Sequence, residues 1–234
     1  MNTMITQLDT GQPAFPPVER ALNIPQGLLA IGGNLNTDTL IEAYRRGIFP
    51  WFEEGQPIMW YSPDPRLVLK PEHFHESRSL KKTLRKEPWS IAINRNFDQV
   101  IEACAQSRRG GTWLCSDMIK AYRQLHRAAY AHSVEVYDAQ GRLLGGLYGV
   151  GLGCMFFGES MFSRVDNASK VALSALCKLM HRHGLPLIDC QIYSDHLHGL
   201  GAQLIRRQDF IRQISKHCGR ATPAALWQAR RLEI

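Results

Sequence analysis

Residues 133–162, SVEVYDAQGRLLGGLYGVGLGCMFFGESMF, constrain the fold of this chain more than any other stretch. They are rich in β-branched, aromatic and glycine residues, and the turn-forming run Ala139, Gln140 and Gly141 interrupts them, as is typical of a hairpin. We therefore expect two or three antiparallel strands here. Helices with one apolar face are expected over the neighbouring segments 97–107, 116–130 and 167–184. Strands interleaved with helices in this way predict an α+β domain with a mixed sheet, and not a doubly wound sheet.

Shorter elements complete this region. Strands are expected in three apolar segments, at 67–70, 89–95 and 186–193. The segment SRSLKKTLRK predicts a basic helix. Ser116 is the expected N-cap of its helix, and Gly184 is expected to end the helix that precedes it in the chain.

The chain before this region has a different character. The segment TDTLIEAYRR predicts a helix that is capped by Thr37 or Asp38 and closed by Gly47. Four prolines follow within a short aromatic-rich stretch, IFPWFEEGQPIMWYSPDP, which excludes a long helix and predicts an irregular, packed connector. We therefore predict a small N-terminal α/β domain at residues 1–64 and a mixed-sheet domain at residues 65–234.

Composition limits the class of protein. A net charge of +7 over 234 residues favours an acidic partner, and nucleic acid is the commonest partner of that kind. The six cysteines are scattered without a C-x-x-C pair, which indicates buried thiols in a reducing compartment. No apolar run approaches the ~20 residues that cross a bilayer, and no export signal is visible. We expect a soluble, cytoplasmic protein without a membrane partner.

One carboxylate stands out in the apolar run that ends the constraining stretch. Strict strand alternation puts Glu159 on one face with Phe157 and Met161. An acid among such side chains must be paired, hydrogen-bonded or poised for a ligand, because an isolated buried charge is too costly. About thirty residues later, LIDCQ places Asp189 and Gln191 together on another strand. The two strands predict a polar site between them.

Both acids also have structural explanations. Glu159 could form an internal ion pair with Arg164 or Lys170. Asp189 could cap a nearby element or pair with an arginine.

At this point the sequence resembles a known family, the bacterial leucyl/phenylalanyl-tRNA–protein transferases. The resemblance is carried by the segments GLLAIGGNL, AYRRGIFPWF, PIMWYSPDPR, SRSLKK, GGTW, AHSVEVY, GGLYGV, FGESMFSR, NASKVAL, LIDCQ and LGAQLIRR. They follow one another in order from about residue 15 to residue 210. Such ordered agreement is more specific than any single motif.

The resemblance implies a fold and a reaction. The main domain is expected to be like the GCN5-related N-acetyltransferases, nearest the FemABX aminoacyltransferases. The enzyme is expected to move Leu or Phe, less often Met, from aminoacyl-tRNA to the α-amino group of proteins that begin with Arg or Lys, in N-end rule degradation. A monomer is expected. No cofactor or metal is expected, because forming an amide from an ester runs downhill in free energy and needs only water exclusion, alignment, oxyanion stabilisation and proton removal.

The resemblance also implies site residues. Asp189 and Gln191 carry catalysis, either as a relay for the proton of the amine or by positioning alone, and Glu159 and Asp189 bind the N-terminal Arg or Lys of the acceptor. The side chain of the donor amino acid fits an apolar pocket made by Leu147, Met161, Leu173, Leu176, Met180 and Ile188. Trp51 and Trp113 hold the terminal adenosine of the tRNA. The backbone of the tRNA lies along Arg78, Lys81, Lys82 and Arg85. Each set also has a purely structural explanation: the apolar and aromatic residues could belong to the core, and the basic residues could form a solvated helix face.

Two other functions stay open. An acetyl-CoA-dependent N-acetyltransferase on the same fold needs a glycine-rich pyrophosphate loop, which Arg142, Gly145 and Gly146 only partly imitate, in a predicted hairpin. A non-catalytic tRNA-binding module is favoured only if Glu159, Asp189 and Gln191 are tied up in salt bridges. Zinc is not expected, because the three H-x-H pairs lack further ligands at zinc spacing; the pairs are His73/His75, His181/His183 and His196/His198.

Overall fold

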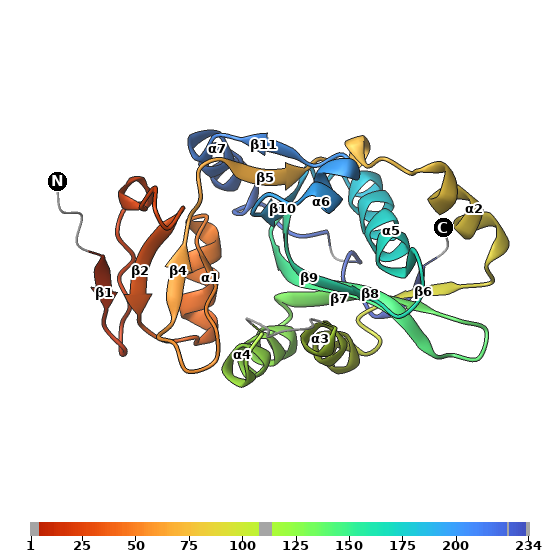
Figure 1. Ribbon diagram of the computed structural model, residues 1–234, viewed down its shortest axis with the longest axis horizontal. Coiled ribbons are helices and arrows are strands. Elements are labelled where there is room, and N and C mark those ends of the chain that lie inside the picture. Colours follow the sequence, from red (N-terminus) through yellow and green to blue (C-terminus); the bar gives the residue numbers. More distant parts are fainter. Residues whose placement is uncertain (1–4, 108–113, 224, 233–234) are drawn as a thin grey trace.

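The computed structural model describes residues 5–107, 114–223 and 225–232, and the chain forms two β-sheets with helices packed against them (Figure 1). The smaller sheet has four strands in the order β1-β2-β4-β3. The strands are β1 (Thr6–Leu8), β2 (Leu28–Gly32), β3 (Phe49–Pro50) and β4 (Met59–Tyr61), and helix α1 (Thr37–Arg45) connects β2 to β3. Strands β1 and β2 are parallel, whereas β4 pairs antiparallel with β2 and β3.

The start of α1 differs from the prediction. The N-cap is Asn36, whose backbone is extended, so Thr37 and Asp38 already lie inside the helix and neither is its cap. The end of α1 is as predicted: Gly47 has a φ of +73° and donates its backbone N–H to the carbonyl oxygen of Tyr44. A left-handed residue at this place is the usual helix terminator, and glycine adopts it without steric cost.

The proline-rich connector is more regular than predicted. Strands β3 and β4 lie within it and pair antiparallel, so the expectation of a wholly irregular segment is wrong. Pro50 fits this arrangement because β3 is the outer strand of its sheet, where a missing backbone N–H breaks no ladder.

The larger sheet has eight strands in the order β11-β5-β10-β9-β8-β7-β6-β12. The strands are β5 (Arg66–Leu69), β6 (Ser90–Ile93), β7 (Ala131–Tyr137), β8 (Leu143–Leu152), β9 (Met155–Ser163), β10 (Leu187–Gln191), β11 (Gln203–Ile205) and β12 (Arg230–Leu232). Strands β9 and β10 pair in parallel, and the other neighbours pair antiparallel. Strands β7, β8 and β9 confirm the antiparallel strands expected from the sequence. The fold is mixed α and β with a mixed sheet.

Helices cover both faces of the larger sheet (Figure 1). The helices are α2 (Arg78–Lys86), α3 (Phe97–Gln106), α4 (Ser116–Arg127), α5 (Ala168–Arg182), α6 (Asp195–Gly199) and α7 (Arg207–His217), with short 3-10 helices at Val18–Arg20 and Pro71–His73. Ser116 was predicted to be the N-cap of α4. It is instead the first residue of the helix, so this prediction is wrong. Cys115 holds the N-cap position, and the backbone N–H of Ser116 donates to Oε2 of Glu54 at 3.4 Å.

The larger sheet separates two apolar cores. One core joins α3, α4, one sheet face and the small N-terminal sheet, and it includes Tyr44, Tyr122 and Phe157. The other lies between the opposite face and α5, and it includes Leu147 and Leu176. Within the described ranges, we find no helix with the length and apolar character that crossing a membrane requires.

A β-bulge in β9 moves part of the site from one core to the other. The register between β8 and β9 shifts after the pair Tyr148–Ser160, so that Gly149 lies opposite Gly158. A bulge adds one residue and reverses the alternation beyond it. Glu159 therefore points to the first core and Met161 to the second. The prediction that both share a face is wrong, because it assumed an uninterrupted strand.

Candidate active site at the divergence of β9 and β10

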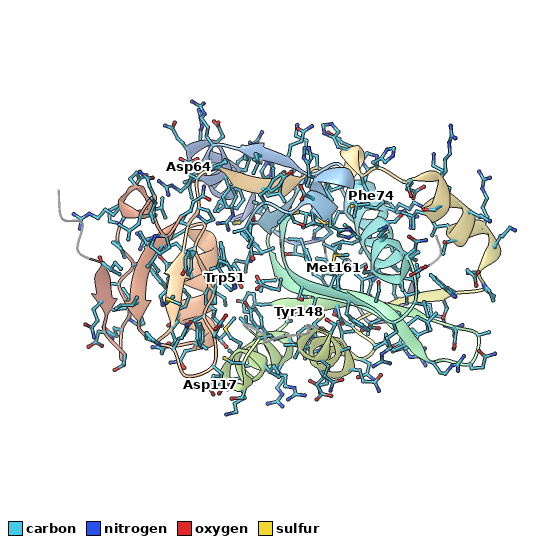
Figure 2. All side chains as sticks on the ribbon, in the orientation of Figure 1. Trp51, Asp64, Phe74, Asp117, Tyr148 and Met161 are labelled. Atoms are coloured by element: carbon cyan, nitrogen blue, oxygen red, sulfur yellow. The ribbon has the colours of Figure 1, made fainter. Side chains whose placement is uncertain are left out.

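A cavity opens where β9 and β10 separate. Their parallel ladder ends at the pair Phe157–Asp189. Beyond this pair β9 continues along β8, whereas β10 ends two residues later. The cavity between the diverging strands measures about 320 Å³. Figure 2 shows Trp51 on the side of the N-terminal sheet, with Tyr148 and Met161 across from it on the larger sheet.

The inner wall of the cavity is apolar. Five of the six predicted pocket residues line it: Leu147, Met161, Leu173, Leu176 and Ile188. Met180 does not belong to this lining, contrary to the prediction; it is fully buried in the core behind the cavity. Helical spacing correctly puts Met180 on the same face of α5 as Leu176, but one turn farther along, where the cavity no longer reaches.

Glu159 lies in the cavity wall, 8% exposed, and accepts hydrogen bonds from neutral groups. The hydroxyl of Tyr44 donates to Oε1 at 2.7 Å, and that of Tyr122 donates to Oε2 at 2.7 Å. Gln191 Nε2 donates to Oε1 at 2.8 Å. Burial raises the pKa of Glu159 to about 7; the nearby charge of Asp189 also raises it, whereas the hydrogen bonds from Tyr122, Tyr44 and Gln191 lower it.

Asp189 lies in a buried ion pair with Arg66, the first residue of β5. Oδ1 accepts from Arg66 Nε at 2.8 Å and Oδ2 accepts from Nη2 at 2.7 Å, with both side chains 1% exposed or less. The guanidinium carbon lies 4.7 Å from the ring centroid of Phe49 and 4.6 Å from that of Phe210, and Nη1 donates to the carbonyl oxygen of Gly47 at 3.2 Å. The charge of this carboxylate is therefore matched inside the protein, by the strongest geometry that an arginine offers.

Gln191 connects the two acids. Its backbone N–H donates to Oδ1 of Asp189 at 2.9 Å, and its side chain donates to Glu159. Its φ of 65° is left-handed, which costs a non-glycine residue about 1–2 kcal/mol. The register between β10 and β5 also shifts at this point. Asp189 thus holds the backbone of Gln191 in the turn that brings its amide to Glu159.

The structural explanations for the acids have different outcomes. The suggested partners of Glu159 are engaged elsewhere, since Arg164 donates to a backbone carbonyl group and Lys170 to an asparagine side chain. For Asp189, the pairing with an arginine is confirmed, and the arginine is Arg66.

The mouth of the cavity carries exposed apolar side chains. Trp51, Ile192 and Tyr193 line it and are 39%, 40% and 52% exposed. Trp113, the second predicted adenosine residue, lies outside the described residues. Cys190 also contributes to the lining, and burial raises the pKa of its thiol well above the usual value, which disfavours it as a nucleophile.

Three residues of this site were missed from the sequence. Tyr44 and Tyr122 lie on the apolar stripes of α1 and α4, and Arg66 is the first residue of the otherwise apolar strand β5. The sequence offers one weak signal for them: a tyrosine hydroxyl or an arginine that is buried needs a polar partner.

Comparison with known proteins places the chain. The family described as "Leucyl/phenylalanyl-tRNA protein transferase" matches residues 68–215, and the N-terminal domain of the same family matches residues 33–64. The chain belongs to this family. The leucyl/phenylalanyl-tRNA–protein transferase of Pseudomonas fluorescens Pf0-1 is 53% identical over 216 residues, 92% of this chain and 95% of the relative. That of Pseudomonas syringae pv. syringae B728a is 52% identical over 231 residues, 98% of this chain and 100% of the relative.

Among solved structures, L-PGS from Bacillus licheniformis aligns with 73% of this chain and 57% of its own at 10% identity and a TM-score of 0.38. Likeness at that level says nothing about function. Membership of the leucyl/phenylalanyl-tRNA–protein transferase family makes the protein an aminoacyltransferase.

The glycine pair considered for an acetyl-CoA-dependent enzyme lies within the β-ladder. Gly145 is opposite Val136 on β7 and Ser163 on β9, inside β8. Its backbone therefore belongs to the middle of a sheet and not to a helix N-terminus that could bind a pyrophosphate. This agrees with a leucyl/phenylalanyl-tRNA–protein transferase, and not with the acetyltransferase alternative.

The predicted basic helix is confirmed as α2. Ser77 caps it, accepting a hydrogen bond from the backbone N–H of Leu80, and Leu80 is buried. The predicted tRNA-contacting residues are all exposed: Arg78, Lys81, Lys82 and Arg85. Helix α2 packs beside α5, at the end of the molecule far from the N-terminal sheet (Figure 1). In the described part of the chain, no three His, Cys, Asp or Glu side chains gather as a metal site would require.

Proposed function

We propose that this protein transfers Leu or Phe, and less often Met, from aminoacyl-tRNA to the α-amino group of proteins that begin with Arg or Lys, in N-end rule degradation. The observation that carries the proposal is the cavity, apolar inside and lined by Glu159, Asp189 and Gln191 on its polar side, in a chain of this family. We further propose a cytoplasmic monomer that needs no cofactor or metal, since the ester of the donor already supplies the free energy.

The donor side chain enters the apolar end. A cavity of about 320 Å³ is at the small end of ligand sites, as suits one aminoacyl group. Such pockets separate side chains that differ by a methylene by only about 1–3 kcal/mol. Leu, Phe and Met are therefore all accepted, at different rates.

The tRNA approaches from the mouth. Trp51 is half exposed there and offers a ring face for the terminal adenosine, a contact worth roughly 1–3 kcal/mol. Trp113 shares this role by resemblance to the family. The exposed cations of α2, Arg78, Lys81, Lys82 and Arg85, contact the backbone of the acceptor stem.

The acceptor enters on the polar side. Glu159 makes this part of the cavity negative, whereas the charge of Asp189 is matched by Arg66. A negative site favours the positively charged N-terminus of an acceptor that begins with Arg or Lys. Gln191 Nε2 carries two hydrogens, of which Glu159 takes one. The second is available to the developing oxyanion of the ester carbonyl. Asp189, held by Arg66, acts by positioning Gln191.

We also propose the architecture that the family resemblance implies. The larger sheet is then like the GCN5-related N-acetyltransferases, nearest the FemABX enzymes, and its parallel pair β9 and β10 diverges at the site. We propose in addition that residues 1–64 and residues 65–234 form two domains, because each part has its own sheet.

A direct assay tests the function. The purified protein is incubated with tRNA charged with radiolabelled Leu and with peptides that begin with Arg, Lys or Ala, without ATP or CoA. Label is expected on the Arg and Lys peptides, and not on the Ala peptide or on an N-acetylated Arg peptide. Retention of the charged tRNA without transfer would favour the binding module, and acetyl-CoA turnover would favour the acetyltransferase.

A pair of leucines tests the pocket. Leu173 lines it, whereas Leu179 on the same helix is similarly buried and does not line it. Leu173→Ala enlarges the pocket, so it is expected to raise the ratio of kcat/KM for Phe over Leu about tenfold. Leu179→Ala loses stability of the same order, about 2–5 kcal/mol, without moving that ratio. Equal ratios in the two variants would place the donor elsewhere.

A further inference from the structure

Resting on the proposed function, we propose that Glu159 is the catalytic residue that accepts the proton of the incoming α-ammonium, and that Tyr44 and Tyr122 are positioning residues that let it hold this proton. The role of proton acceptor therefore belongs to Glu159 and not to Asp189.

The contacts of Glu159 leave room for one N–H group. Oε1 accepts from Tyr44 and Gln191, which uses both of its lone pairs, and Oε2 accepts from Tyr122. Among the described contacts, one lone pair of Oε2 remains for the substrate. A single position suits one N–H of an ammonium group. It does not suit the fork of a guanidinium, which takes both oxygens of a carboxylate.

The two tyrosines satisfy both protonation states. Their hydroxyl oxygens are 2.6 Å apart, close enough for a hydrogen bond in either direction. When Glu159 is ionised, each hydroxyl donates to one of its oxygens. When a proton on Oε2 turns from the substrate to Tyr122, the hydroxyl of Tyr122 turns to Tyr44, which still donates to Oε1. No buried polar group loses its partner, so the proton moves in and out at low cost.

Asp189 lacks this freedom. Oδ1 accepts from Arg66 Nε and from the backbone N–H of Gln191, and Oδ2 accepts from Arg66 Nη2. Arg66 cannot turn away, because it lies between Phe49 and Phe210. Protonating Asp189 would leave a buried guanidinium unmatched.

The surroundings of Glu159 agree with a proton acceptor. The groups that face it are Tyr44 of α1, Tyr122 of α4 and Asp189 of β10, with Tyr148 of β8 beside the tyrosines. Burial, and then the charge of Glu159, raises the pKa of Tyr44 and Tyr122 well above the usual value, so both remain hydroxyl donors. The pKa of Glu159, about 7, is close to the 7.7–8.0 of an ordinary α-ammonium group.

The step balances as follows. Glu159 takes one proton from the α-ammonium, leaving a neutral amine. The nitrogen lone pair forms a bond to the ester carbonyl carbon, and the bond from that carbon to the ribose oxygen breaks. The second proton of the nitrogen passes to the ribose oxygen, giving an amide and a free tRNA hydroxyl. Glu159 then releases its proton to water.

The test is the pH dependence of kcat in the full-length protein with saturating charged tRNA and Arg-initiated peptide. Wild type is expected to rise through an inflection near pH 7. Glu159→Gln keeps the size of the side chain but cannot take the proton. It is expected to fall about 100-fold at pH 7, to lose that inflection, and to recover partly by pH 9 as free amine becomes abundant.

Tyr122→Phe supplies the second readout. It removes a hydrogen bond that favours the charged carboxylate, so the inflection is expected to move up by about one pH unit. Tyr137→Phe is the matched control, because Tyr137 is also buried and donates to another buried glutamate, Glu135, at 3.5 Å. It is expected to leave the inflection in place.

The proposal would be overturned by a Glu159→Gln profile that retains the inflection near pH 7, by a loss of less than threefold at pH 7, or by equal shifts in both tyrosine variants. A deficit of Glu159→Gln that disappears with a donor whose own α-amine is replaced by a hydroxyl would also overturn it, by assigning Glu159 to the donor. Absence of transfer by the wild type would instead refute the proposed function.

Discussion

Replacing Arg66 with methionine tests the ion pair on which the site is built. Methionine keeps much of the apolar stem of Arg66 between Phe49 and Phe210 but removes the charge. Asp189, 0% exposed, is then left as a buried carboxylate without its cation. Breaking a buried pair from one side costs about 3–5 kcal/mol. At about 2–4 °C per kcal/mol for a chain of this size, Tm is expected to fall by roughly 6–20 °C.

The assay is urea unfolding of four proteins: wild type, Arg66→Met, Asp189→Asn and the double variant. Removing both charges is often nearly neutral, so the double variant is expected to be more stable than Arg66→Met. Asparagine retains an oxygen for the backbone N–H of Gln191. A loss below about 1 kcal/mol in Arg66→Met, or a double variant less stable than the single one, would refute the buried pair as the organising contact.

Other regions give three further predictions. Burial lowers the pKa of His132 to about 3, below its unfolded value near 6.5, so the unfolded chain binds the extra proton and stability falls as pH drops below about 6.5. Between pH 7 and pH 5, the free energy of unfolding from urea titrations is expected to fall by about 2 kcal/mol less in His132→Gln than in the wild type. Parallel curves of unfolding free energy against pH for the two proteins would contradict this. Trp51→Ala is expected to weaken an aminoacyl-adenosine analogue about 5- to 150-fold by calorimetry, and an unchanged Kd would exclude stacking there. Lys82→Glu with Arg85→Glu is expected to raise KM for tRNA and reduce its salt slope by roughly 1.5–2, whereas Lys216→Glu on α7 is not; equal effects would mean that only net charge matters.

Local patterns predicted the elements well where one physical cause dominates. The hairpin around Ala139 to Gly141, the basic helix α2 and the glycine that ends α1 each follow from residues close in sequence. Pro50 was misjudged because its effect depends on whether its strand is at the edge of a sheet, which is a property of the whole fold.

The site was predicted in part for the same reason. Glu159, Asp189 and Gln191 are polar groups in apolar strands, and their burial together follows from sequence. The bulge in β9 was not predictable from alternation, and it moves Met161 away from the face of Glu159. The partners Arg66 and Tyr122 come from distant segments, and only the tertiary structure selects them.

The sources of these partners bear on how such a protein can be recombined. Tyr44 and Phe49 come from the segment around the small sheet, Arg66 from the strand that follows it, and Tyr122 from α4. A chimaera joining the opening sixty residues of one relative to the remainder of another would inherit half of this constellation from each parent. Such exchanges are tolerated only when both parents carry matching halves, so the boundary between the sheets is a poor crossover point despite its loop-like sequence.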